Sequence, residues 1–223
     1  MRNRLPTARK TDISQIKVRR PRQLAFKLPT HGGKRRGAGR KPAGSKALVS
    51  HLARPRFDRP TPTHVTMRVR NEVWNLRSRR SLRVFLECFE QSLGRFGARL
   101  IEFSVQGNHV HLIIEADSNE TLSRAMQGLS IRLAKALNCM MNRHGHVFAD
   151  HYHSRLLRSP TELVRAIAYV LGNAAHHFGE TGPDPFTSRA LPEDLRPRVL
   201  GRPLGWLVRV GRRRGAPPQL ETG

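Results

Sequence analysis

The sequence predicts an α+β fold: a ferredoxin-like, four-stranded antiparallel sheet backed by helices, with a disordered basic N-terminal arm. Two patterns of apolar residues predict this fold. Short segments alternate apolar and polar residues, as half-buried strands do, and longer segments repeat apolar residues at helical spacing. Along the chain the two patterns follow the order strand, helix, strand, strand, helix, strand, helix. Residues before about 63 show neither pattern.

The arm spans residues 1–62 and carries 18 Lys or Arg residues but only two acids, Asp12 and Asp58. A segment with so much charge and so few periodic apolar residues cannot form a packed core. We expect DNA contacts from the basic side chains of residues 31–42. These side chains could enter a minor groove in the style of an AT-hook, or belong to a solvated tail with nonspecific phosphate affinity. They are Lys34, Arg35, Arg36, Arg40 and Lys41.

The predicted folded domain covers residues 63–178. We expect its opening strand at residues 64–70 and its first helix at 78–96, ended by Gly94 or Gly97. Two further strands, at 98–105 and 107–115, are joined at Gly107-Asn108, a pair that suits a tight hairpin because both residues tolerate positive φ.

Three elements complete the predicted domain. A second helix begins at Ser118 or Thr121 and stops near Gly145, and an edge strand or long extended segment follows at 146–158. The last helix has a clear start, with Ser159 at the cap, Pro160 at the first helical position and Glu162 three residues after the serine. Residues 179–223 form a Pro- and Arg-rich extension, in which the apolar piece 205–210 could dock back onto the domain.

Composition limits the partners and the location. The 223 residues carry a formal net charge of +25, which favours nucleic acid over a membrane or an acidic protein. Cys88 and Cys139 lie in apolar helical patterns and are interpreted as reduced core residues of a cytosolic protein. No apolar segment is long enough to span a membrane, and no secretory signal follows the charged N-terminus, so we expect a cytoplasmic protein.

Two motifs carry candidate chemistry. His109 and His111 alternate along one strand, so they project from one face and could hold one divalent ion. On the last helix, Asn173 follows Tyr169 at i+4 on the same face. The tyrosine could then act as a nucleophile and the Asn173 amide oxygen as a third ligand of Mg²⁺ or Mn²⁺. Each motif alone has a plainer interpretation: a histidine pair on a solvated face, a half-buried helix tyrosine, and a polar residue near a helix end.

Taken together, residues 107–114, 148–155 and 168–173 resemble the single-tyrosine HUH transposases, and most closely the branch of REP-associated tyrosine transposases of bacteria. The resemblance covers about residues 63–178. It implies a ferredoxin-like enzyme that cuts and rejoins single-stranded DNA near imperfect hairpins through a 5′-phosphotyrosine link. Tyr169 would be the nucleophile, and His109, His111 and Asn173 the metal ligands.

The resemblance also implies partners and one difference. REP-like single-stranded hairpins would be the substrate of a nucleoid-associated protein acting as a monomer or homodimer. Arg155 and Arg158 precede the last helix and are candidate contacts that position the DNA, but alternation would send them to opposite faces, so at most one would point at the active site. Arg155 is favoured, because it lies within the segment that resembles the transposases. Many relatives have proline after the asparagine, whereas this chain has Ala174, which lets the helix extend to His176 and His177.

Three other interpretations fit parts of the sequence. A histidine-triad nucleotide hydrolase needs a third histidine where Ile113 stands. A noncatalytic basic nucleic-acid-binding protein would also suit the charge, but it could form no covalent adduct with DNA. A zinc cluster would need a regular ligand spacing, which is not found among His144, His146, His151, His153 and Cys139.

Overall fold

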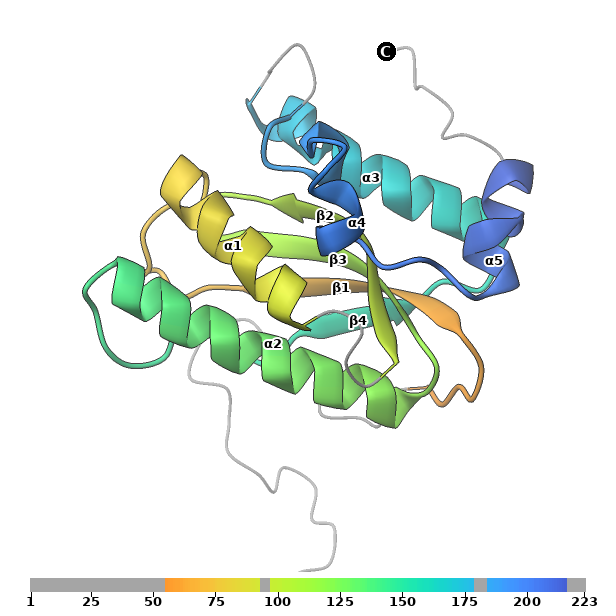
Figure 1. Cartoon of the computed structure of the whole chain (residues 1–223), viewed down its shortest axis with the longest axis horizontal. Helices are drawn as coiled ribbons and strands as arrows, with labels where there is room; N and C mark the ends of the chain where they lie inside the picture. The colour runs from red at the N-terminus through yellow and green to blue at the C-terminus, as the bar shows by residue number, and fades with distance from the viewer. Residues whose placement is uncertain (1–54, 93–96, 179–183, 216–223) are drawn as a thin grey trace, which may run out of the picture. The chain divides into compact units, whose positions relative to one another are not determined.

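The computed structural model describes residues 55–92, 97–178 and 184–215 (Figure 1). Its sheet contains β1 (Thr61–Arg68), β2 (Ala98–Val105), β3 (His109–Ala116) and β4 (His153–Leu156). The strands are antiparallel and follow the order β2-β3-β1-β4, which puts β1 and β3 in the centre. This order confirms the predicted ferredoxin-like sheet.

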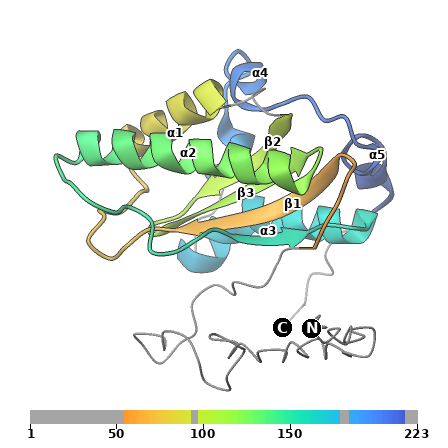
Figure 2. The ribbon, with the colours of Figure 1, turned by 90° about the horizontal axis from the view of Figure 1, so that it is seen from below.

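The two faces of the sheet are covered by different helices. α1 (Arg79–Ser92) and α2 (Asn119–Met140) lie on one face, and α3 (Pro160–Phe178) lies on the other (Figure 2). Because side chains alternate along a strand, Val110 and Leu112 of β3 join the larger core beneath α1 and α2. Ile113 joins a smaller core with α3. His109 and His111 have the same parity as Ile113, so they belong to the α3 face.

Side-chain caps begin α2 and α3 where the sequence predicts them. Ser118 Oγ accepts a hydrogen bond from Thr121 N at 3.2 Å, and Ser159 Oγ accepts one from Glu162 N at 3.2 Å. The Glu162 carboxylate accepts from Arg158 N at 2.7 Å, one residue before the position expected in a capping box. The start of α3, and with it the position of Tyr169 along the helix, is therefore determined locally.

The Gly107-Asn108 hairpin forms, but for a different reason from the one predicted. Gln106 N donates to His109 O at 2.8 Å, which closes the turn, yet neither central residue has positive φ. The two carbonyls of the turn instead accept hydrogen bonds from Val69 N and Leu76 N. The turn before His109 is thus held by the β1–α1 connection.

The extension after α3 returns along the sheet through η1 (Ser188–Ala190), α4 (Arg196–Val199), α5 (Trp206–Arg209) and η2 (Gly211–Arg214). Its first anchor is a buried ion pair, in which Asp184 accepts two hydrogen bonds from Arg77 at 3.0 and 3.1 Å. The second anchor is the fully buried carboxylate of Glu115, which accepts from the backbone N–H groups of Leu204 and Gly205. Docking of the apolar piece 205–210 is thereby confirmed.

Two other expectations change. The extended segment at 146–158 contains only the four-residue strand β4 and an isolated bridge between Val69 and Phe148. Cys88 is buried as predicted, but Cys139 is exposed, so its interpretation as a core residue was wrong. Among the described residues, no helix combines the length and apolarity needed to cross a bilayer.

Candidate active site

β3 brings the two predicted metal-ligating histidines together on the α3 face. His109 Nε2 and His111 Nε2 lie 3.0 Å apart, with the rings nearly perpendicular. Two ligands about 2.1 Å from one ion and at right angles to each other would be about 3 Å apart. The spacing of these nitrogens therefore fits adjacent ligand positions on one cation.

The other ring nitrogen of each histidine also has a partner. His109 Nδ1 donates to Asn108 Oδ1 at 2.7 Å, which leaves its Nε2 as the unprotonated nitrogen of a neutral ring. His111 Nδ1 lies 3.1 Å from both His64 Nε2 and Thr66 Oγ1. A partner at Nδ1 orients the ring and, when it accepts from Nδ1–H, leaves Nε2 available to a metal.

His64 is the residue of this cluster that the sequence interpretation missed. β1 pairs with β3 so that Thr66 lies opposite His111 and His64 lies diagonally from it, on the same face. Burial lowers the pKa of His64 to about 4, with smaller contributions from His153 and Arg155. His64 is therefore neutral at physiological pH and can accept a hydrogen bond from His111.

The signal that could have identified His64 was its alternation with Val65 and Met67. Those two side chains point into the core beneath α1 and α2, which sends His64 to the other face. The predicted ferredoxin-like order puts this strand beside β3, but the sequence did not reveal the register of the pair. The register, with Thr66 opposite His111, makes His64 part of the cluster.

α3 brings Tyr169 over the histidines. The Tyr169 ring meets His111 edge-on at 5.3 Å between centroids, and His64 at 6.0 Å. His111 is only 4% exposed, whereas Tyr169 is 48% exposed. Tyr169, His64 and His111 belong to the same chain.

Asn173 lies one turn after Tyr169 on α3 and is buried, at 1% exposure. Among the described atoms, its Nδ2 finds no hydrogen-bond partner. Rotation of the carboxamide about χ2 exchanges the oxygen and the nitrogen, so an acceptor oxygen can occupy the same position. A buried Nδ2 without a partner is costly, and the flipped carboxamide, which places its oxygen there, is compatible with the predicted ligand role.

The predicted donor set would suit a cation that takes further ligands from substrate and water. No three or more His, Cys, Asp or Glu side chains in the described part of the chain are grouped to hold a metal ion. The three imidazoles form a row instead, because His64 approaches the Nδ1 of His111 and not the space beside its Nε2. Two imidazoles and one amide oxygen would leave open coordination positions, as Mg²⁺ or Mn²⁺ sites commonly have.

The predicted DNA-contacting arginines lie beside this face. Arg155 is paired with His64 in the β1–β4 register and forms a 3.7 Å ion pair with Glu162. Arg158 follows β4 at the start of α3, where it is exposed. The predicted arm residues Lys34, Arg35, Arg36, Arg40 and Lys41 lie outside the described residues.

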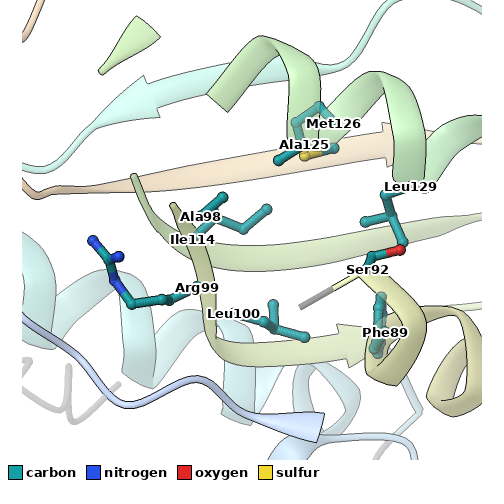
Figure 3. Close-up of a pocket in the computed structure, with 9 residues that line it drawn as sticks. All are labelled: Phe89, Ser92, Ala98, Arg99, Leu100, Ile114, Ala125, Met126 and Leu129. Carbon is teal, nitrogen blue, oxygen red and sulfur yellow. The ribbon is translucent and has the colours of Figure 1, made fainter. Parts of the chain in front are cut away.

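The small cavity on the opposite face is no alternative site. It lies between α1, α2 and one end of the sheet, and its lining is mostly apolar, including Phe89, Leu100 and Met126 (Figure 3). Its volume of about 30 Å³ has room for about one or two water molecules. The chemistry-bearing side chains are all on the α3 face.

Comparisons with known proteins identify one family model and similar solved folds. Residues 62–170 match the family model described as "Transposase IS200 like". A solved REP-associated tyrosine transposase bound to a REP hairpin is similar, with a TM-score of 0.55 and 13% identity, and the match covers 70% of this chain and 94% of that one. At that identity the likeness shows the fold alone.

A second solved structure comes from Deinococcus radiodurans R1 and is described as a candidate transposase. It has a TM-score of 0.38 and 11% identity, and the match covers 52% of this chain and 91% of that one. No curated protein sequence matches the chain.

Proposed function

We propose that this chain, whose residues 62–170 match the IS200-like transposase family model, is a metal-dependent enzyme that cuts and rejoins single-stranded DNA through a covalent tyrosine link. One observation carries the proposal. Tyr169 meets His111 edge-on, and the Nε2 of His111 lies 3.0 Å from that of His109. A phenol ring and two imidazole nitrogens thus lie together in one chain, which supports the proposed roles of nucleophile and metal ligands.

In the proposed reaction, Tyr169 Oη attacks the scissile phosphorus. The bond from oxygen to phosphorus forms, the bond to the 3′ oxygen breaks, the phenolic proton is lost and the departing oxygen leaves as a 3′ hydroxyl. The 5′ phosphate stays on Tyr169 until another 3′ hydroxyl attacks it and releases the tyrosine. A divalent cation held by His109, His111 and Asn173 would polarise the phosphate and stabilise the charge on the departing oxygen.

The chain's own residues do the positioning. α3 holds Tyr169 on a capped helix, so the phenol reaches the substrate from a rigid element. His64 and Thr66 hold His111 at Nδ1, and Asn108 holds His109. Each proposed ligand on β3 is therefore oriented before substrate arrives.

The proposed substrate is a single-stranded hairpin of the REP type. A flexible single strand can bend so that one phosphate lies in line with the tyrosine, whereas a duplex must first be opened. Arg155 and Arg158 would contact phosphates beside the site, and Lys34, Arg35, Arg36, Arg40 and Lys41 would contact DNA from the arm. The net charge of +25 supports a polyanionic partner.

A covalent adduct tests the function directly. The full chain is incubated with a labelled single-stranded hairpin and Mg²⁺, and the products are separated on a denaturing gel. A labelled band at the mass of protein plus DNA is expected, and it should persist in Tyr152→Phe but be lost in Tyr169→Phe. A noncatalytic binding protein would shift the hairpin on a native gel and form no adduct.

Competition tests the substrate class. Labelled hairpin bound to the protein is challenged with unlabelled hairpin or with fully paired duplex of the same sequence, and the hairpin should displace it at lower concentration. Arg155→Ala should reduce the salt dependence of hairpin binding by about 0.7 in the log–log slope, as for one phosphate contact. Arg83→Ala, which removes an exposed arginine from the far side of the sheet, is the matched control. Equal displacement by hairpin and duplex would contradict the preference.

A further inference from the structure

A second cavity, of about 570 Å³, opens at the end of the sheet where β1 begins and β4 ends. Its lining combines aromatic, aliphatic and arginine side chains, including Phe57, Arg59, Pro62, Leu157, Arg158 and Trp206. Arg56 also lines it, and Asp58 is the single acid among the described residues of its lining. We call this cavity the Trp206 cleft. Its volume is in the range of small-molecule sites, and its charge balance is basic.

Trp206 is held in the cleft by buried contacts. Glu115 Oε1 accepts from Gly205 N at 2.9 Å, and Val208 packs at 5% exposure into the core beneath α3. A side chain at position 205 would collide with Glu115 and with the backbone of Pro60, so glycine is required at this close approach. Trp206 nevertheless remains 54% exposed. The backbone beside Trp206 is thus anchored, and Arg214 lies 5.9 Å from the centroid of the indole ring. The exposed part of this indole is suited to stacking on a ligand.

The lining matches the chemistry of an unpaired nucleotide. Single-stranded nucleic acids are bound by aromatic side chains that stack on bases and by basic groups that follow the phosphates. Trp206 supplies the aromatic ring. Arg59 and Arg158, which line the same cleft, supply positive charge. The basic surface continues beyond the cleft, since a neighbouring hollow is lined by Arg202, Arg209, Arg212 and Arg213.

The cleft lies next to the candidate active site along the same strand. Pro62 lines the cleft, and His64, two residues later on β1, contacts His111 and Tyr169. Residues two apart point to the same face and are about 7 Å apart along a strand. A single strand whose phosphate lies at Tyr169 can therefore place a nearby nucleotide in the cleft.

We propose that the Trp206 cleft binds an unpaired nucleotide of the strand that carries the scissile phosphate, with its base stacked on Trp206 and its phosphate paired with Arg158 or Arg59. The proposal rests on the function proposed above. Segments on both sides of the family-matched residues build the cleft, because residues 56–61 precede the match and Trp206 and Leu207 follow it. The cleft would select DNA with an unpaired tail beside the hairpin.

Tryptophan fluorescence gives a readout that needs no catalysis. The chain has two tryptophans, so in a Trp74→Phe, Tyr169→Phe background Trp206 is the single emitter and the DNA is not cleaved. The protein is titrated with a blunt hairpin, with the same hairpin carrying a 5′ tail and with one carrying a 3′ tail. Quenching of Trp206 is expected with one of the tailed hairpins and not with the blunt hairpin. Equal response to all three would overturn the proposal.

Affinity measurements provide the second arm. In the full chain carrying Tyr169→Phe, Trp206→Ala should weaken binding of the preferred tailed hairpin by about 5- to 100-fold and leave the blunt hairpin unaffected. Trp74→Ala, which removes the other exposed tryptophan, is the matched control and should change neither affinity. Equal losses for tailed and blunt DNA, or no loss, would contradict the proposal.

The two proposals can fail separately. If the unmutated chain forms a covalent adduct but Trp206 does not distinguish tailed from blunt DNA, the cleft assignment fails and the proposed function stands. If no DNA forms an adduct but tail-dependent quenching is seen, the enzyme assignment fails and the cleft is a single-strand binding site.

Discussion

His64 Nε2 lies 3.1 Å from His111 Nδ1, the ring nitrogen that is not directed at His109. This contact links the first strand of the domain to the central strand that carries both proposed ligands. It makes His64 a positioning residue for His111, because an acceptor at Nδ1 orients the ring and keeps Nε2 available.

Replacing His64 should weaken metal binding more than it weakens the fold. We expect His64→Ala to reduce Mn²⁺ affinity by about 10- to 100-fold, measured by electron paramagnetic resonance at pH 7.5. His64→Gln should recover part of the loss, because its carboxamide oxygen can also accept from His111 Nδ1–H. His146→Ala removes an exposed imidazole and serves as the control. Unchanged affinity in a folded His64→Ala protein would contradict the positioning role.

Tyr169→Phe should abolish cleavage and leave hairpin binding largely intact, because the change removes only the attacking oxygen. The Tyr169 ring still packs edge-on against His111 in the variant, so the helix and sheet should keep their arrangement. Binding is measured by gel shift and cleavage on a denaturing gel. Full cleavage by the variant, or an adduct that moves to Tyr152, would refute the assignment.

Cleavage should require a divalent ion held by the two histidines of β3. His109→Ala and His111→Ala should each reduce activity by at least about 10- to 100-fold, since even changes to residues that only orient ligands have effects of that size. Excess chelator should stop cleavage by the unmutated chain, and added Mg²⁺ or Mn²⁺ should restore it. Undiminished cleavage in chelator would exclude metal assistance.

Removing the arm should weaken DNA binding without destroying the chemistry. Residues 1–54 carry 16 of the 41 Lys and Arg residues, and each phosphate contact contributes about −0.7 to the salt slope on single strands. A deletion that ends at residue 54 retains Phe57, whose backbone N–H donates to Asn119 at 2.8 Å. We expect the slope to fall by a few units. An unchanged slope would show that the folded domain supplies the contacts.

The two cysteines should differ in reactivity. Burial raises the pKa of Cys88 to about 11, with a smaller contribution from Glu87, whereas Cys139 is exposed. The raised pKa keeps the Cys88 thiol protonated in the folded protein. The contribution of this thiol to the free energy of unfolding is therefore fully present below the ordinary pKa of 9.0, and it is lost as pH rises from 9 to about 11. At pH 8 a disulfide reagent should label one thiol in the folded chain, two in urea, and none in folded Cys139→Ser. Two rapidly labelled thiols in the native protein would contradict this burial.

Local patterns predicted the elements well, because their causes are local. The caps at Ser118 and Ser159 and the alternation around His109 and His111 depend on residues within a few positions of one another. The same local reasoning was wrong for Cys139. An apolar pattern along a helix does not show how far the core extends towards the end of that helix, and Cys139 is exposed there. It also assigned the Gly107-Asn108 turn to positive φ, whereas contacts with Val69 and Leu76 hold that turn.

The sequence by itself determined the order of strands and helices, the face that carries His109 and His111, and the place of Tyr169 on a capped helix. Only the tertiary structure decided the register of β1 against β3, and so brought His64 to His111. It also decided that the Glu115 carboxylate would anchor Gly205 and hold Trp206 beside β1. The physical reason is that periodicity fixes the direction of a side chain relative to its own backbone. The neighbours that the side chain meets depend on long-range strand pairing and burial, which no local pattern encodes.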